Sequence, residues 1–226
     1  MIKEAVDIFK SYKQIKGAEQ YVQGLRPLYE EIYKVLPKSN RTVDVGCAYG
    51  IMSLACKLRG DANVYALDMT DKFTNLKMFH YNGISFEKYD IERTPDEHGS
   101  GSNFPYSGDL MILTEVLEHF NSNPLPSIKK IYACLNKGGH VVCSTPAKEL
   151  WGTTENMNAG MGKKKGLWND LDSWRDIPEY KGKWKDQHTF HYDQFELVSL
   201  FTEAGFIVEE VKIISQFSHL LVGRKP

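Results

Sequence analysis

The chain has 226 residues, with 28 Lys and Arg against 29 Asp and Glu, which gives a formal net charge of -1. This length fits one large domain and is enough for a full hydrophobic core. Hydrophobic residues at 42% and charged residues at 25% are typical of a globular protein in water. The balanced charge disfavours a protein that binds nucleic acid by neutralising phosphates, although a local basic patch stays open.

The cysteines and the N-terminus point to a reducing compartment. None of the four cysteines forms a C-x-x-C pair, and three of them lie in apolar runs, where a free thiol packs as a small hydrophobe; they are Cys47, Cys56, Cys134 and Cys143. The first residues, MIKEAVDIFKSYKQ, lack the apolar stretch of a signal peptide. No run approaches the roughly 20 apolar residues of a membrane span. We therefore expect a cytoplasmic protein with reduced thiols.

The first half of the chain is predicted to alternate helices with strands. Residues 1–36 have apolar side chains at helical spacing, and Pro37 ends that segment. An apolar helix is expected at 51–58, and another that Asp71 caps and that runs to Phe79. Short β-branched or apolar runs predict strands at 42–46, 63–68, 83–90 and 109–114, with a loop at 92–108.

The second half ends in a hairpin. Helices are expected at 127–135 and at 193–204, where Gly205 ends the second one, and Glu115 to Phe120 begins a helix or a helical turn. A turn at 136–139 precedes a strand at 140–145, and the strands at 206–214 and 218–223 are close enough to pair antiparallel. Alternating strands and helices favour an α/β fold with a doubly wound, mostly parallel sheet, helices on both faces, and an antiparallel edge.

The whole of 1–226 is predicted to be a single domain, with N-terminal helices at 1–38 and an insertion at 147–190. The insertion is too aromatic for a disordered linker, so we expect it to cover the site as a cap. Its tryptophans could stack on a sugar, an aromatic ring or a base, or could form a small core of the cap; they are Trp151, Trp168, Trp174 and Trp184. The lysines at 163–165 could lie in a solvated loop or could bind an anionic group such as a phosphate.

A turn rich in small residues follows the first strand, in VDVGCAYG at 43–50. Gly46 and Gly50 are expected to leave room for a ligand beside the backbone, at the carboxyl end of the sheet. Ala48 replaces the middle glycine of the G-x-G-x-x-G motif and the third glycine is absent, which disfavours a pyrophosphate site and with it an NAD-binding protein. Asp44 would repel a pyrophosphate but suits an ammonium group.

Three acids end three consecutive strands. Asp68 follows the glycine turn by about 20 residues and can accept both hydroxyls of a ribose. Asp90 can accept an exocyclic amine, and Asp44 joins them at the same edge of the sheet. Each acid alone would suit a solvated strand end or a helix cap. Together with the glycine turn, the three indicate a nucleoside site.

These motifs resemble those of class I S-adenosylmethionine-dependent methyltransferases. VDVGCAYG is similar to their motif I, usually Asp/Glu-x-Gly-x-Gly-x-Gly, with Ala48 as a departure that should only narrow the turn. ALDMT and YDIE resemble the ribose- and adenine-binding motifs, and LTEVLEHF and LNKGGHVVCSTP resemble the next two blocks. The resemblance covers about residues 40–146 and HTFHYDQFELVSLFTEAGF near the end.

The resemblance implies a Rossmann-like seven-stranded sheet of order 3-2-1-4-5-7-6, with the seventh strand antiparallel. It also implies S-adenosylmethionine as the methyl donor. By the same resemblance, the donor-binding residues are Asp44, Gly46, Cys47, Ala48, Gly50, Asp68, Met69, Asp90, Ile91 and Thr114.

A second group of polar residues follows the fourth strand. Glu115, Glu118 and His119 have the i, i+3, i+4 spacing that a helix would place on one face, toward the cleft. Two carboxylates and an imidazole so close together favour a positive charge between them, which a divalent cation supplies. The alternative is an acid pair at a helix N-terminus beside a histidine with ordinary hydrogen bonds.

Glu-x-x-Glu-His followed by a distant His resembles the metal set of small-RNA 3′-terminal 2′-O-methyltransferases, and it is similar to ubiquinone-pathway O-methyltransferases. The resemblance implies Glu115, Glu118, His119 and His188 as metal ligands, with His188 preferred over His191. A mixed set of carboxylates and imidazoles suits Mg²⁺, Mn²⁺ or Zn²⁺, and the sequence does not choose among them. The predicted catalytic residues are His119, Glu118 and His188. Without a metal, His119 or His188 could be a general base.

The leading hypothesis is therefore an O-methyltransferase for a small hydroxylated molecule. A cation that chelates two vicinal hydroxyls would align and activate one of them, which favours a sugar-like diol or a catechol as acceptor. The alternatives are an RNA 3′-terminal 2′-O-methyltransferase, which the balanced charge opposes, and a non-catalytic nucleoside-binding module on the same fold. The oligomeric state stays open at this stage.

Overall fold

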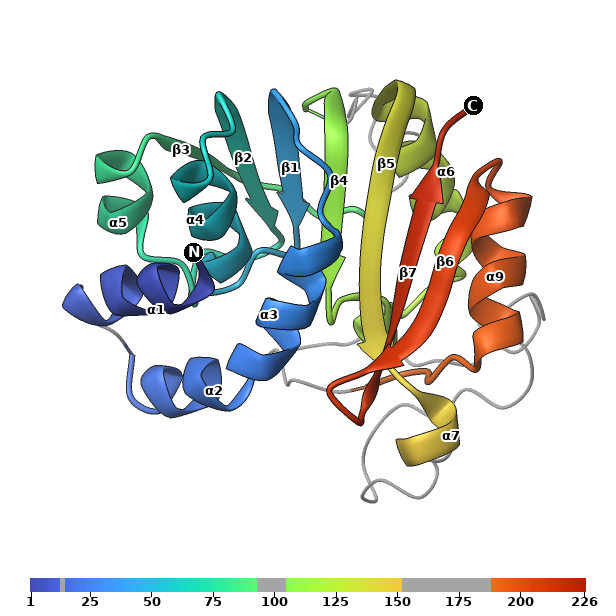
Figure 1. Ribbon diagram of the computed structural model, residues 1–226, viewed down its shortest axis with the longest axis horizontal. Helices are drawn as coiled ribbons and strands as arrows, with labels where there is room; N and C mark the ends of the chain where they lie inside the picture. The colour runs from blue at the N-terminus through green and yellow to red at the C-terminus, as the bar shows by residue number, and fades with distance from the viewer. Residues whose placement is uncertain (13–14, 93–104, 152–187) are drawn as a thin grey trace.

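The computed structural model describes residues 1–12, 15–92, 105–151 and 188–226. It contains one twisted sheet with helices packed on both of its faces (Figure 1). The elements in chain order are α1 (Ile2–Ser11), α2 (Ala18–Gly24), α3 (Arg26–Val35), β1 (Arg41–Val45), α4 (Ile51–Leu58), β2 (Asn63–Asp68), α5 (Leu76–Tyr81), β3 (Ile84–Lys88), β4 (Gly108–Thr114), η2 (Leu117–His119), α6 (Pro124–Cys134), β5 (Leu135–Pro146), α7 (Lys148–Trp151), α9 (Gln194–Glu203), β6 (Ile207–Ile214) and β7 (Ser218–Arg224).

The seven-stranded sheet has the order β3-β2-β1-β4-β5-β7-β6. Strands β1 to β5 pair in parallel, and β7 runs antiparallel to both β5 and β6. This confirms the predicted Rossmann-like order and its antiparallel seventh strand. Val45 of β1 pairs with Leu67 of β2 and with Leu113 of β4, so the carboxyl ends of the central strands meet at one edge.

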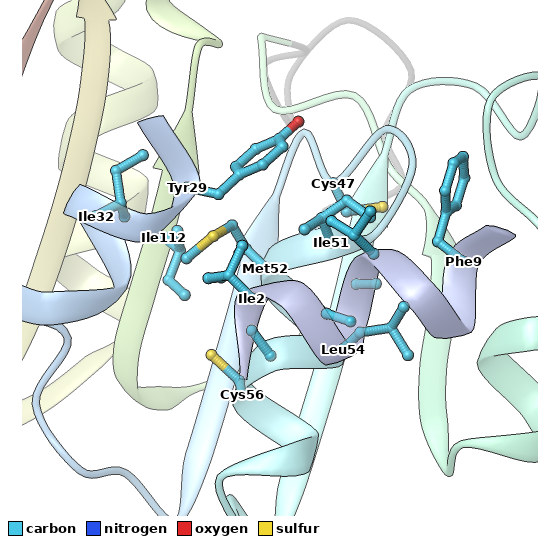
Figure 2. Packing of buried hydrophobic residues seen from close by; sticks show 14 of the residues in the cluster. Ile2, Phe9, Tyr29, Ile32, Cys47, Ile51, Met52, Leu54, Cys56 and Ile112 are labelled. Atoms are coloured by element: carbon cyan, nitrogen blue, oxygen red, sulfur yellow. The ribbon is translucent and has the colours of Figure 1, made fainter. Parts of the chain in front are cut away.

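The core has two halves, one on each face of the sheet. Leu110 and Ile112 of β4 pack in the half that α1, α3 and α4 cover, whereas Met111 and Leu113 pack in the half that α6 and α9 cover. Figure 2 shows the first half, with residues of α1 and α3 lying against α4. Both faces of the central strands are buried, which explains why their sequences are almost continuously apolar.

The predicted helical segment at 1–36 is divided into three helices. Gly17, with φ of 87°, begins α2 in a left-handed conformation that only glycine adopts easily. Pro27 lies in the first turn of α3, where its missing N–H costs no hydrogen bond. The breaks let α1 lie across α4 while α2 and α3 turn toward the carboxyl edge of the sheet (Figure 1).

Three predicted boundaries differ from the structure by three residues or more, and others differ by one or two. The helix expected from Asp71 begins only at Leu76, because the side chain of Asn75 caps it by accepting a hydrogen bond from the Met78 N–H (3.1 Å). Helix α6 begins at Pro124 rather than at 127, since its first turn tolerates proline. Strand β5 already begins at Leu135, so the expected turn at 136–139 is instead an irregular start of that strand.

The C-terminal predictions are confirmed. Asp193 and Glu196 form a capping box at the start of α9, and Gly205, with φ of 108°, follows the helix. Strands β6 and β7 form the expected antiparallel hairpin.

Only the two ends of the predicted cap fall among the described residues. Trp151 ends α7 and donates from Nε1 to the Phe217 carbonyl (2.9 Å). The other three tryptophans and the lysines at 163–165 lie outside the described residues. None of the helices that the structure describes has the length and apolarity needed to cross a membrane.

Candidate active site

A cavity opens at the carboxyl edge of the sheet, over β1 and β4. The glycine turn forms one wall, and helices α2 and α3 lie opposite it. The lining residues are Tyr21, Leu25, Tyr29, Asp44, Gly46, Cys47, Ala48, Ile51, Met52, Thr114 and Glu115. The cavity therefore brings together the turn predicted to bind a nucleoside and the first residue of the Glu/Glu/His group.

The two glycines of the turn pack closely against protein side chains. Both have positive φ, 72° at Gly46 and 74° at Gly50. A Cβ on Gly46 would lie 2.5 Å from the side chain of Val116, and one on Gly50 would lie 2.1 Å from the ring of Phe79. Both glycines are therefore required by packing, while Gly46 also lines the cavity, and the approach of a ligand to this turn stays a prediction.

Ala48 does more than narrow the turn, contrary to the expectation from the sequence. Its φ of 43° lies in the left-handed region, where a Cβ costs roughly 1–2 kcal/mol. The conformation is held from both sides: the Ala48 N–H donates to Oδ2 of Asp68 (2.9 Å), and the Ala48 carbonyl accepts from the Thr74 hydroxyl (3.1 Å). The turn is therefore tied to the segment that follows β2.

Asp68 is almost fully buried at the end of β2, and burial raises the pKa of its carboxyl. Its second oxygen, Oδ1, accepts from the Thr70 N–H (3.0 Å), beside the half-exposed Met69. Each carboxylate oxygen has two lone pairs, so both can still accept a ribose hydroxyl. The predicted adenine-binding residues follow β3, where Asp90 Oδ1 accepts from the Glu92 N–H (3.0 Å) and Ile91 is buried.

Asp44 lies inside the cavity wall rather than at the surface. Its Oδ2 accepts from the hydroxyl of Ser53 in α4 (2.6 Å), and burial raises the pKa of its carboxyl to about 6. Thr114 lines the same cavity, and its Oγ1 is buried without a hydrogen-bond partner. A buried hydroxyl without a partner is costly, so a ligand that hydrogen-bonds to it would be favoured.

Glu115 does not share a helical face with Glu118 and His119, contrary to the sequence-based expectation. Its backbone is left-handed, with φ of 53°, and the element that comes directly after it is the short 3₁₀ turn η2. The carboxylate instead accepts from Ser144 Oγ on β5 (2.7 Å) and from Ser218 Oγ on β7 (3.0 Å). The sequence reasoning missed both serines, because a serine in a strand carries no signal for such a contact.

Burial and the nearby Glu118 raise the pKa of the Glu115 carboxyl to about 8. The folded protein then binds a proton that the unfolded chain releases near pH 4.5, so the free energy of unfolding should fall as the pH rises from about 4.5 to 8. We expect Glu115→Gln to remove part of this fall, on the order of a few kcal/mol. Urea unfolding of both proteins at pH 5 and pH 8, in EDTA, measures it. An equal pH dependence in the two proteins would contradict the assignment.

Glu118, His119 and His188 form a compact cluster. One ligand atom from each lies within 4.8 Å of the other two, and Glu115 is not part of this group. Glu118 is buried, with Oε1 3.6 Å from His119 Nε2 and with Oε2 accepting from the Thr145 hydroxyl (3.1 Å). The Phe190 N–H donates to the Glu118 carbonyl (3.3 Å), which holds the distant His188 segment against the turn.

His191 lies behind this cluster. Its Nε2 is 2.8 Å from Nδ1 of His188, and its side chain is buried. Burial, together with the neighbouring His119 and His191, lowers the pKa of His188 to about 3, so His188 is neutral at physiological pH. Of the two histidines considered as a fourth ligand, His188 is therefore the one in the cluster, and His191 fixes the orientation of its ring.

Comparisons with known proteins match most of the chain to one family. A family model described as "Methyltransferase domain" matches residues 18–211. A curated ubiquinone biosynthesis O-methyltransferase from Pseudomonas savastanoi pv. phaseolicola is 33% identical over 107 residues, which are 46% of this chain and 44% of that protein. The chain thus matches less than half the length of that relative.

Solved structures share the fold at low sequence identity. The S-adenosylmethionine dependent methyltransferase from Mesorhizobium loti has a TM-score of 0.61 at 18% identity, covering 89% of this chain and 97% of that one. The magnesium protoporphyrin IX methyltransferase from Synechocystis, solved with bound S-adenosylhomocysteine, has a TM-score of 0.61 at 14% identity, covering 99% and 94%.

Proposed function

We propose that this chain, which belongs to the methyltransferase domain family, transfers a methyl group from S-adenosylmethionine to a hydroxyl oxygen of a small metabolite. The proposed acceptor is either a vicinal diol, such as a sugar or a sugar-derived compound, or a catechol. The observation that carries the proposal is the cavity at the carboxyl edge, which both the glycine turn and Glu115 line. Glu118 and His119 of the Glu118, His119 and His188 cluster follow Glu115 by three and four residues in the chain.

The donor half of the site is built from strand ends. Asp68 would accept the ribose hydroxyls, and Asp90 and Ile91 would contact the adenine after β3. With this strand order, the methionine half of the donor would lie toward β1 and β4, where the cavity lies. The transferred methyl group would then face the segment after β4, which carries Glu118 and His119.

The acceptor half suits a divalent cation. Glu118, His119 and His188 would hold it, a mixed carboxylate and imidazole set that Mg²⁺, Mn²⁺ or Zn²⁺ accepts. Thr145 and His191 already orient Glu118 and His188, as partners behind metal ligands commonly do. When bound, the cation would lower the pKa of an acceptor hydroxyl and align a second one. Without a bound cation, His119, about a quarter exposed, could instead act as a general base and take the proton that the hydroxyl loses.

A turnover assay tests the function directly. Formation of S-adenosylhomocysteine is measured against separate pools of sugars and other vicinal diols, catechols, and RNA 3′ ends, each with and without EDTA. We expect transfer to the diol or catechol pool. Transfer to RNA ends alone would replace this acceptor class by the RNA alternative. Donor binding without turnover on any pool would favour a nucleoside-binding module.

Asp68→Asn should weaken the binding of S-adenosylhomocysteine by about tenfold. The amide keeps the size of the side chain but loses the charge that strengthens hydrogen bonds to the ribose, an effect of roughly 1–2 kcal/mol. Isothermal titration calorimetry measures the dissociation constant. Asp71→Asn, at an exposed position three residues later, is the matched control and should bind as the parent does. Equal affinity of both variants would remove Asp68 from the donor site.

A further inference from the structure

Trp151, the last residue of α7, is held in one place although it is 40% exposed. Its Nε1 donates to the Phe217 carbonyl (2.9 Å), and its ring meets the Phe217 ring edge-on, with centroids 6.3 Å apart and an angle of 76° between the planes. A tryptophan ring gains much from burial, so a fixed ring that stays partly open to solvent leaves apolar surface available to a ligand.

The short helix that carries Trp151 is anchored on two sides. The Lys148 N–H donates to the Tyr192 carbonyl (3.1 Å), which ties α7 to the segment before α9. Glu149 Oε2 lies 2.7 Å from Nε2 of His219, a buried residue of β7. Because both contacts fix the helix, the tryptophan ring loses little freedom when a ligand packs against it.

The ring of Trp151 also borders the cluster that would bind the acceptor. Its centroid lies 6.2 Å from that of the His188 ring, and the His188 ring lies 5.1 Å from the ring of His119. A ligand oxygen lies about 2 Å from the cation that it coordinates, and interacting aromatic rings have centroids roughly 4.5–7 Å apart. A ring whose hydroxyls bind a cation in this cluster is therefore within reach of Trp151.

The surroundings of the cluster on this side offer ring surface rather than hydrogen bonds. Nε1, the polar atom of the Trp151 side chain, already donates to the Phe217 carbonyl. Nδ1 of His188 is likewise engaged with Nε2 of His191 (2.8 Å). The further hydroxyls of a sugar need hydrogen-bond partners, whereas the face of a catechol needs only an apolar or aromatic surface. Of the two acceptor classes in the proposed function, the catechol suits Trp151 better.

We propose that Trp151 is a specificity-determining residue that stacks on the ring of a catechol acceptor and makes the site prefer a catechol to a saturated vicinal diol. The inference rests on the proposed function and narrows its acceptor class. Both oxygens of a catechol lie in the plane of its ring, so chelation by one cation also orients that plane. Stacking on a side chain that is already fixed then adds affinity at little further cost in entropy.

The test compares two probes with the same pair of vicinal hydroxyls, catechol and cis-1,2-cyclohexanediol. Calorimetry measures their dissociation constants with S-adenosylhomocysteine present, which prevents turnover, and with Mg²⁺, Mn²⁺ and Zn²⁺ in turn. We expect the parent protein to prefer catechol. Trp151→Leu should weaken catechol binding by about tenfold and cyclohexanediol binding by less than about twofold. In turnover, the same variant should raise KM for catechol with little change in kcat, because stacking stabilises bound substrate and transition state alike.

Two control variants separate the ring from the rest of α7. Trp151→Phe keeps an aromatic ring but loses the hydrogen bond to Phe217, and it should retain most of the preference for catechol. Leu150→Ala, at an exposed neighbouring position in α7, should change the affinity for neither probe. All three variants should bind S-adenosylhomocysteine as the parent does, which shows that they are folded.

Three results would overturn the inference. The first is a parent protein that binds cyclohexanediol as tightly as catechol. The second is an equal change for both probes, or no change, in Trp151→Leu. The third is a loss in Trp151→Phe as large as in Trp151→Leu, which would assign the effect to the hydrogen bond rather than to the ring. If the parent binds neither probe, the diol or catechol acceptor of the proposed function is itself wrong, so the two failures are distinguishable.

Discussion

Removing divalent cations with EDTA should abolish methyl transfer while S-adenosylhomocysteine binds as before. The acceptor would lose both its alignment and the activation of its hydroxyl, whereas the donor contacts lie on other strand ends. Glu118→Gln and His188→Ala should have the same effect, a loss of roughly a hundredfold or more in turnover. Turnover is measured with the best acceptor pool, and the affinity for S-adenosylhomocysteine by calorimetry.

Two controls distinguish a metal-dependent reaction from general-base catalysis by His119 without a metal. Added Mg²⁺, Mn²⁺ or Zn²⁺ should restore the parent enzyme after EDTA but not the two variants. His80→Ala, at an exposed position in α5, should leave turnover unchanged. If the parent is fully active in EDTA and His119→Ala is inactive, His119 acts as a general base without a metal.

Gly50→Ala should strongly destabilise the protein. A methyl group there would lie 2.1 Å from the ring of Phe79, a fully buried side chain in a packed core. Overpacking of this kind costs typically about 1–3 kcal/mol, and the positive φ of 74° adds roughly 1–2 kcal/mol for a residue with a Cβ. Urea unfolding of the ligand-free protein measures the combined loss.

Gly60→Ala is the matched control for this substitution. Gly60 also has a positive φ, 99°, but nothing lies within 4 Å of a Cβ at that position. The free energy of unfolding of Gly60→Ala should therefore fall by only roughly 1–2 kcal/mol, the cost of a Cβ at a positive φ. If the two variants are equally stable, Phe79 moves aside without cost, and the glycine at position 50 is needed for its φ alone.

Features encoded by short local patterns could be predicted from the sequence. The alternation of apolar strands with helices led to the sheet and its closing hairpin, because a strand buried on both faces must be apolar along its whole length. The acids Asp44, Asp68 and Asp90 could be assigned to one edge, because parallel strands that alternate with helices all end on the same side of a sheet. The resemblance to methyltransferase motifs added the strand order.

Features that depend on contacts between distant segments could not be predicted. The spacing of Glu115, Glu118 and His119 suggests a helix, but the left-handed backbone at Glu115 interrupts it. That conformation is compatible with the serine contacts made by the Glu115 carboxylate, which come from positions 144 and 218. A pattern within a few residues cannot contain contacts made across 29 and 103 positions.

The sequence by itself therefore determined the fold class, the edge of the sheet that carries the site, and the residue types available there. Only the tertiary structure decided which of these residues meet. It separated Glu115 from the Glu118, His119 and His188 cluster and placed His191 behind His188. It also filled the space beside Gly46 and Gly50 with Val116 and Phe79. The physical reason is that the periodicity of a chain sets which face a side chain takes, whereas packing between elements sets what lies opposite it.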